Sequence, residues 1–235
     1  MPNQFYLLPG LDGTGRLFRG FCDAADPSHT TTVLPLPTNT QQDYESLARE
    51  LSAVVAGASK AVVIAESFSG PIAVKIAARH PASVSAVVLV ASFVTPPAPA
   101  VARLVPWSLI LRLPVPAFAA RRLILGATAR DDLVHALQRS VREVPPKILA
   151  QRIRELTYLN ACKELFAVKC PIMYLRPSAD RLVPKHCIDA LRESKADLEF
   201  REIEGPHLIL QREPVNAWCA ISDFLSGIPS IGRID

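Results

Sequence analysis

Mostly apolar runs alternate with helix-like stretches from the start of the chain to about residue 91. The runs are rich in β-branched and aromatic side chains and lack a regular alternation of polar and apolar residues, as in strands that are buried on both faces. Parallel strands need long crossovers, which are usually helices. The pattern therefore predicts a mostly parallel sheet with helices on both faces. We expect its first four strands at residues 4–8, 31–36, 61–65 and 84–91.

The alternation stops between residues 95 and 165, where the chain is first rich in proline and then helical in pattern. Two further strand-like runs follow at residues 170–175 and 198–203, so the middle segment is typical of an insertion between two strands of one sheet. The length of 235 residues, 49% of them hydrophobic, suits a single large core. We expect a core built from residues 1–94 and 166–235, with residues 95–165 as a helical cap.

The excess positive charge of the chain lies in the expected cap. Residues 95–165 contain eleven Lys and Arg against five Asp and Glu, whereas the rest of the chain contains fifteen against seventeen. Such an excess belongs either to a solvated helical surface or to a surface that attracts an acidic partner or substrate.

Ser67 stands where the third strand-like run ends and a helix-like stretch begins. A nucleophilic serine on such a strand–turn–helix elbow projects its hydroxyl from the edge of the sheet. The residues two before and two after it must be small, because strand and helix nearly touch there. Here they are Ala65 and Ser69 instead of the glycines of G-x-S-x-G. The structural alternative is a serine that only caps the following helix.

Asp180 and His207 lie on loops directly after the last two predicted strands. The carboxyl ends of parallel strands share one edge of the sheet, so these loops and the elbow can meet in space. A serine hydroxyl needs a neighbouring base, and histidine is the side chain that changes its charge near neutral pH. An aspartate can fix the imidazole tautomer and stabilise its protonated form. The structural alternatives are a turn aspartate and a surface histidine.

A glycine-rich loop, LPGLDGTG at residues 8–15, follows the first strand. Its backbone N–H groups can face a substrate carbonyl or cradle a phosphate. We favour an oxyanion hole, because no G-K-[ST] follows and the spacing does not fit a dinucleotide fingerprint.

Together these segments resemble the α/β-hydrolases along essentially the whole chain: the P-G-L-D-G loop, the elbow, S-A-D-R-L-V-P and G-P-H occur in the family's order. The resemblance implies an α/β-hydrolase sheet with Ser67 as nucleophile, His207 as base and Asp180 as orienting acid. It also implies oxyanion hydrogen bonds from the backbone N–H groups of Leu11 and Phe68. The chain departs from the family in two ways. It lacks both elbow glycines, and its sheet starts at what is normally the third strand, so the N-terminal hairpin is expected to be missing.

The leading hypothesis is a serine esterase that cleaves carboxylic esters through an acyl-enzyme. An apolar acyl site between cap and sheet is expected from side chains that are otherwise core residues: Phe93, Trp107, Leu111 and Phe118. The small cap and its charge resemble those of the pimeloyl-carrier methyl esterases, whose arginines hold an acidic acyl carrier protein. The resemblance implies carrier contacts from Arg121, Arg122, Arg139, Arg142, Arg152 and Arg154.

Two alternatives remain open. A thioesterase acting on acyl-CoA or an acyl carrier uses the same triad and differs only in the leaving group. A non-catalytic ligand-binding protein can also be built on a hydrolase scaffold, because fold does not dictate function.

Other features of the sequence narrow the class of protein. No run of about 18 uncharged apolar residues predicts a membrane span, and no basic leader precedes the first strand, so we expect no transmembrane segment and a cytoplasmic protein. The five cysteines are widely spaced with no C-x-x-C pair, which indicates free thiols and no zinc site. In the absence of Walker and dinucleotide motifs, we expect no metal or organic cofactor and no nucleic-acid partner.

Overall fold

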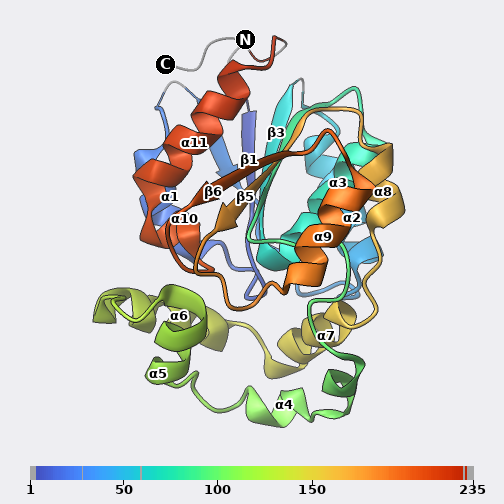
Figure 1. Cartoon of the computed structure of the whole chain (residues 1–235). Helices are drawn as coiled ribbons and strands as arrows, with labels where there is room; N and C mark the ends of the chain where they lie inside the picture. The colour runs from blue at the N-terminus through green and yellow to red at the C-terminus, as the bar shows by residue number, and fades with distance from the viewer. Residues whose placement is uncertain (1–3, 28, 59, 230, 232–235) are drawn as a thin grey trace.

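Six parallel strands form one sheet in the order β2-β1-β3-β4-β5-β6 (Figure 1). The computed structural model describes residues 4–27, 29–58, 60–229 and 231. Every strand pairing within these residues is parallel, so the predicted α/β fold is confirmed. The strands are β1 (Gln4–Leu8), β2 (Thr30–Val33), β3 (Ala61–Glu66), β4 (Val84–Val90), β5 (Ile172–Pro177) and β6 (Glu199–Ile203).

The chain changes direction across the sheet between β1 and β3. After β1 it runs to the edge strand β2, and it then returns to the other side of β1 and continues through β3 to β6. In open α/β sheets the loops that follow the two strands at such a switch point leave a crevice for a ligand. The loop after β1 and the elbow after β3 therefore flank the expected ligand site.

Helices cover both faces of the sheet (Figure 1). The strands bury alternate side chains on opposite faces: Val63 of β3 packs in one hydrophobic cluster and Ile64 in the other. Burial on both faces explains why the strands are apolar throughout rather than at every second residue. One face carries α2 (Tyr44–Val55), α3 (Gly70–Arg79), α8 (Cys162–Ala167) and α9 (Lys185–Ser194); the other carries α1 (Arg19–Ala24), α10 (Ile209–Arg212) and α11 (Pro214–Ser226).

The second strand is shorter than predicted. It ends at Val33, whereas the pattern predicted a strand through Leu36. Leu34 still donates its backbone N–H to Leu7, but Leu36 donates to Gly13 of the glycine-rich loop. The apolar run therefore continues past the strand because it packs against that loop.

The described segment between β4 and β5 contains helices and no strand. It lies at the end of the molecule opposite the termini (Figure 1). Prolines divide its first half into short turns, whereas its second half forms two amphipathic helices. The elements are the 3₁₀ turn η3 (Ala100–Leu104), α4 (Trp107–Ile110), α5 (Ala117–Ala119), the π-helical turn η4 (Ala120–Leu125), α6 (Asp131–Glu143) and α7 (Pro146–Leu156).

We call residues 95–165 the cap. The helix α8 straddles its expected end and packs against α3 and α9 of the core. Among the described residues, no helix combines the length and apolar character needed to cross a bilayer.

Candidate active site

The backbone at Ser67 turns sharply between β3 and α3. Ser67 has φ of 50°, in the left-handed region that a residue with a Cβ rarely adopts. Such a conformation costs about 1–2 kcal/mol and persists only where the surroundings hold it. The hydroxyl of Ser92, at the end of β4, donates to the Ser67 carbonyl over 2.7 Å and helps to fix the turn.

Strand and helix approach each other closely behind the elbow at Gly70. A Cβ on Gly70 would overlap the Oγ of Ser92. Ser69 is fully buried and its hydroxyl donates to the carbonyl of Pro9, so it ties the elbow to the loop after β1. The sequence argument missed Gly70 because it is the first residue of an ordinary helix, and only the position of Ser92 reveals the crowding.

Ser67, His207 and Asp180 lie in hydrogen-bond contact. His207 Nε2 is 2.9 Å from Ser67 Oγ, and His207 Nδ1 is 2.9 Å from Asp180 Oδ2 and 3.0 Å from Oδ1. A carboxylate only accepts hydrogen bonds, so Nδ1 carries the proton and Nε2 accepts from the serine hydroxyl. The structure therefore brings Ser67 into contact with a histidine 140 positions later in the sequence, and that histidine into contact with an aspartate 27 positions before it.

Local hydrogen bonds orient Asp180 and His207. Asp180 Oδ1 accepts the backbone N–H of Leu182 over 2.8 Å, which fixes the carboxylate in an Asx turn. Ala179 donates its N–H to the carbonyl of Gly205, so the acid loop and the histidine loop are joined directly. Gly205 has φ of 149°, and a Cβ there would overlap Ile209. The turn that presents His207 thus requires glycine two residues earlier.

An apolar cavity of about 440 Å³ opens onto the triad. Ser67 and His207 line it together with Leu11 and Phe68, the two residues expected to supply oxyanion N–H groups. Seven large aliphatic side chains of the cap also line it: Leu111, Val115, Ile124, Leu137, Val141, Leu149 and Leu156. A cavity of this size and character accommodates a small apolar ligand against the serine.

Two of the four expected pocket residues line this cavity and two do not. Phe93 and Leu111 are in its wall. Phe118 lies largely exposed on α5. Trp107 turns its indole N–H to the carbonyl of Ala102 within the cap, 2.8 Å away. The prediction grouped all four because their residue types suit an apolar site, but the short turns of the first half of the cap direct them differently.

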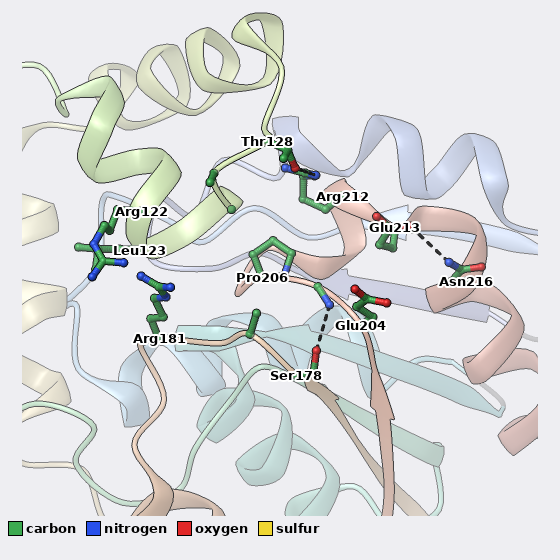
Figure 2. Close-up of a pocket in the computed structure, with 14 residues that line it drawn as sticks. Arg122, Leu123, Thr128, Ser178, Arg181, Glu204, Pro206, Arg212, Glu213 and Asn216 are labelled. Atoms are coloured by element: carbon green, nitrogen blue, oxygen red, sulfur yellow. Dashed lines mark hydrogen bonds between the residues drawn. The ribbon is translucent and has the colours of Figure 1, made fainter.

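A second hollow, of about 590 Å³, lies on the other side of the acid and histidine loops (Figure 2). Figure 2 shows Arg122 and Arg181 at one end of it and Glu213 and Asn216 at the other. It contains charges of both signs, and Ser67 does not line it. The apolar cavity is therefore the candidate substrate site.

Comparison with known proteins supports the fold. No family model matches the chain, and a search of curated proteins gives no match. A solved bromoperoxidase from Bacillus anthracis has a TM-score of 0.82 at 12% identity, with 96% of this chain and 92% of that chain covered. The enol-lactonase from Burkholderia xenovorans LB400 has a TM-score of 0.79 at 13% identity, over 96% and 92%. A membrane phospholipase A described as a bacterial virulence factor has a TM-score of 0.79 at 20% identity, over 97% and 79%. The chain has the α/β-hydrolase fold.

In this hydrolase fold the loop after β1 is held by a buried arginine of the cap. Arg152 of α7 donates from Nη1 to the carbonyls of Leu11 and Asp12, both over 3.0 Å, and from Nε to Gln42 over 2.9 Å. A Cβ on Gly13, which has φ of 71°, would overlap the guanidinium. Burial lowers the pKa of Arg152 to about 10. Arg152 was expected to contact a carrier protein, but it is wholly buried and cannot do so.

The other arginines of the expected carrier surface are more accessible. Arg121 is half-buried, donates to the carbonyl of Ala129 and pairs with Asp131. The remaining four are exposed on η4, α6 and α7: Arg122, Arg139, Arg142 and Arg154.

Asp12 makes a second bond between the cap and this loop. Its Oδ2 accepts the hydroxyl of Thr14 over 2.6 Å and also the hydroxyl of Ser140 on α6. Asp12 is therefore a turn residue whose carboxylate also holds the cap. The loop that presents Leu11 is thus fixed from α6 and from α7.

Glu66, next to Ser67, is a buried carboxyl group. It lies at the end of β3, and the structure buries it. Gln211 donates to its Oε2 over 3.2 Å, whereas Oε1 has no hydrogen-bond partner among the described residues. Burial, with a smaller contribution from the charge of Asp12, raises the pKa of Glu66 to about 8. Glu66 is therefore mostly protonated at neutral pH.

Proposed function

We propose that the protein is a serine hydrolase that cleaves carboxylic esters of apolar acyl groups. The observation that carries the proposal is the continuous chain of contacts from Asp180 through His207 to Ser67 at the wall of an apolar cavity. The hydrolase fold supports it, because the loops that bear these three residues all follow carboxyl ends of strands in the sheet.

The geometry suits acyl transfer in two steps. His207 Nε2 takes the proton of Ser67 as its oxygen attacks the ester carbonyl, and Asp180 stabilises the imidazolium that forms. Backbone N–H groups of Leu11 and Phe68 would bind the oxyanion, each worth roughly 3–4 kcal/mol. His207 then returns the proton to the leaving alcohol, and an acyl-enzyme remains. Water activated by His207 cleaves this acyl-enzyme and releases the acid.

The substrate class follows from the lining of the cavity. Apart from His207, Asp12 is the only acidic or basic residue in the lining that the described residues form, and its carboxylate is already bonded to Thr14 and Ser140. The site therefore favours an uncharged, apolar acyl chain over a charged one.

Hydrolysis of p-nitrophenyl esters over a series of chain lengths tests this function. We expect Ser67→Ala to lower kcat by several orders of magnitude, because triad members act as a unit. Ser69→Ala is the matched control: it removes the neighbouring buried hydroxyl, and labelling by an organophosphonate should persist in it and disappear in Ser67→Ala. Folded wild-type protein that neither turns over esters nor takes the label at Ser67 would instead be a ligand-binding protein on this scaffold.

The nature of the leaving group is a finer part of the proposal. A methyl ester held on an acyl carrier protein is supported by the exposed Arg122, Arg139, Arg142 and Arg154 of the cap. Screening weakens long-range attraction, so kcat/KM on a carrier-linked ester should then fall steeply with added salt. A kcat/KM that does not change with salt would rule out the carrier-linked substrate and leave the proposed esterase function intact. Parallel rates on the methyl ester and the thioester of one acyl chain distinguish an esterase from a thioesterase.

A further inference from the structure

Large apolar side chains are concentrated on the surface of one short part of the cap. Of the twelve large hydrophobic residues that are exposed in the described part of the chain, seven lie between residues 100 and 123. A concentration of this kind marks a surface that contacts a partner or a membrane, whereas single exposed apolar residues need no explanation. The seven are Val101, Leu104, Leu109, Ile110, Leu113, Phe118 and Leu123.

The charged residues of the same segment are all basic. Residues 100–123 contain four arginines and no aspartate or glutamate; Arg121 pairs with Asp131, whereas Arg112 and Arg122 are exposed. Apolar side chains flanked by arginine suit the boundary between the headgroups and acyl chains of an anionic bilayer. We call residues 100–123 the docking segment.

The docking segment also forms part of the substrate cavity. Leu111 and Val115 line the cavity, while Leu109, Ile110 and Leu113 beside them are exposed. The segment is at the end of the molecule farthest from the termini, beyond α6 and α7 (Figure 1). An apolar ester dissolved in a bilayer would therefore reach the cavity through the same residues that touch the lipid.

We propose that residues 100–123 dock the protein on an anionic lipid surface, from which the apolar ester enters the cavity. The evidence for docking is the exposed apolar side chains and the arginines beside them. The entry of an ester substrate from the bilayer additionally rests on the proposed esterase function. Prolines 106, 114 and 116 interrupt the segment, so side chains projecting from short turns make the contact rather than one long amphipathic helix.

The charge and the exposed apolar side chains, taken together, argue against the other occupants of this surface. A symmetric contact between two copies would place one arginine-rich segment against another, because the same patch meets itself in a two-fold dimer. An acidic carrier protein would be attracted by the arginines, but it gives no reason for seven exposed apolar side chains. A bilayer with anionic headgroups satisfies both features.

Vesicle flotation with the Ser67→Ala protein tests the docking without turnover of lipid. We expect binding to phosphatidylglycerol vesicles to be at least tenfold stronger than to phosphatidylcholine vesicles. The double variant Leu104→Ser/Leu113→Ser should lower the partition coefficient about 100-fold, since each buried leucine contributes on the order of tenfold. The matched control is Phe166→Ser/Val215→Ser: its side chains are 76% and 61% exposed, against 84% and 70%, but lie outside the segment. It should bind within about twofold of the parent.

Turnover of a water-soluble p-nitrophenyl ester separates the two proposals. In protein that retains Ser67, the double variant Leu104→Ser/Leu113→Ser should hydrolyse the soluble ester at the wild-type rate, because neither side chain lines the cavity. Arg112→Gln should weaken binding to phosphatidylglycerol severalfold and leave the weak binding to phosphatidylcholine unchanged. Three results would each overturn the docking proposal: no binding to anionic vesicles, equal loss in the control pair, or a dimer in solution that Leu104→Ser/Leu113→Ser dissociates. If the wild-type protein does not turn over the soluble ester, the proposed esterase function is overturned. The vesicle-binding results then decide the docking proposal on their own.

Discussion

Replacing Glu66 by glutamine should remove a large pH dependence from the stability of the protein. Burial raises the pKa of Glu66 from 4.5 to about 8, so the folded protein holds this proton more tightly than the unfolded chain does. The stability linked to a raised pKa is fully present below the unfolded value and is lost as pH rises through the folded value. At about 1.4 kcal/mol for each pH unit, the interval from 4.5 to about 8 corresponds to about 5 kcal/mol.

The local contacts explain why a neutral side chain is preferred at position 66. Oε1 of Glu66 and Oε1 of Gln211 are both buried acceptors without a partner among the described residues. A charged carboxylate there would have one hydrogen bond, from Gln211, to replace its hydration. Glutamine has the same shape, carries no charge at any pH and adds a donor.

Urea unfolding at pH 5, 7 and 9, followed by tryptophan fluorescence, measures the effect. The free energy of unfolding of wild type should fall between pH 5 and pH 9 by several kcal/mol more than that of Glu66→Gln. The exposed Glu50 provides the control, and Glu50→Gln should follow the wild-type pH dependence. Wild-type and Glu66→Gln curves that stay parallel from pH 5 to 9 would refute the argument, because they would show that Glu66 does not titrate in this interval.

Three further substitutions test the contacts around the site. Arg152→Met leaves the carbonyls of Leu11 and Asp12 without their donor, so it should lower the free energy of unfolding in urea by about 2–4 kcal/mol. It should also lower kcat for p-nitrophenyl esters about 10–100-fold, with a smaller change in KM. An unchanged kcat would show that the loop keeps its shape without the arginine. Gly70→Ala gains up to about 1 kcal/mol in helix propensity, but its overlap with Ser92 should make the protein less stable by a net amount of about 1–3 kcal/mol. In a double-mutant cycle, Gly70→Ala should destabilise the protein less when Ser92 is already replaced by alanine. Asp180→Asn should retain the fold and lower kcat by about 10⁴-fold because it favours the wrong imidazole tautomer, and a rate near wild type would remove Asp180 from the triad.

The sheet and the convergence of the three loops could be predicted from sequence, because both follow from local rules. Apolar runs alternating with helices specify a parallel sheet, and the loops after its strands then share one edge. Ser67, Asp180 and His207 each follow such a run directly. Their contact is thus a consequence of topology, whereas the catalytic role assigned to them is still a proposal that the Ser67→Ala experiment tests.

The environment of Arg152 could not be predicted, because it depends on distant parts of the chain. On an amphipathic helix a lone arginine ordinarily lies at the solvent face. Its burial here requires the carbonyls of Leu11 and Asp12, about 140 residues earlier, and the side chain of Gln42. Phe118 shows the opposite error, because its residue type suggests a pocket while the proline-bounded turn at α5 leaves it exposed.

The two halves of the cap differ in how they are attached to the core, and this difference has a consequence for substrate entry. The second half is fastened to the loop after β1 by Arg152 and by Ser140, so moving it would leave buried carbonyls unpaired and displace Leu11. In the described structure the side-chain hydrogen bonds of residues 100–123 go only to other parts of the cap, as in the bond from Arg103 to Thr157. Among the described residues, those at 100–123 therefore have no side-chain hydrogen bond to the loop after β1, whereas the next two residues accept hydrogen bonds from the core: Ile124 from the backbone N–H of Leu208 and Leu125 from Arg212. Contact of residues 100–123 with the proposed lipid surface, from which the substrate would enter, would then leave the bonds that hold Leu11 in place.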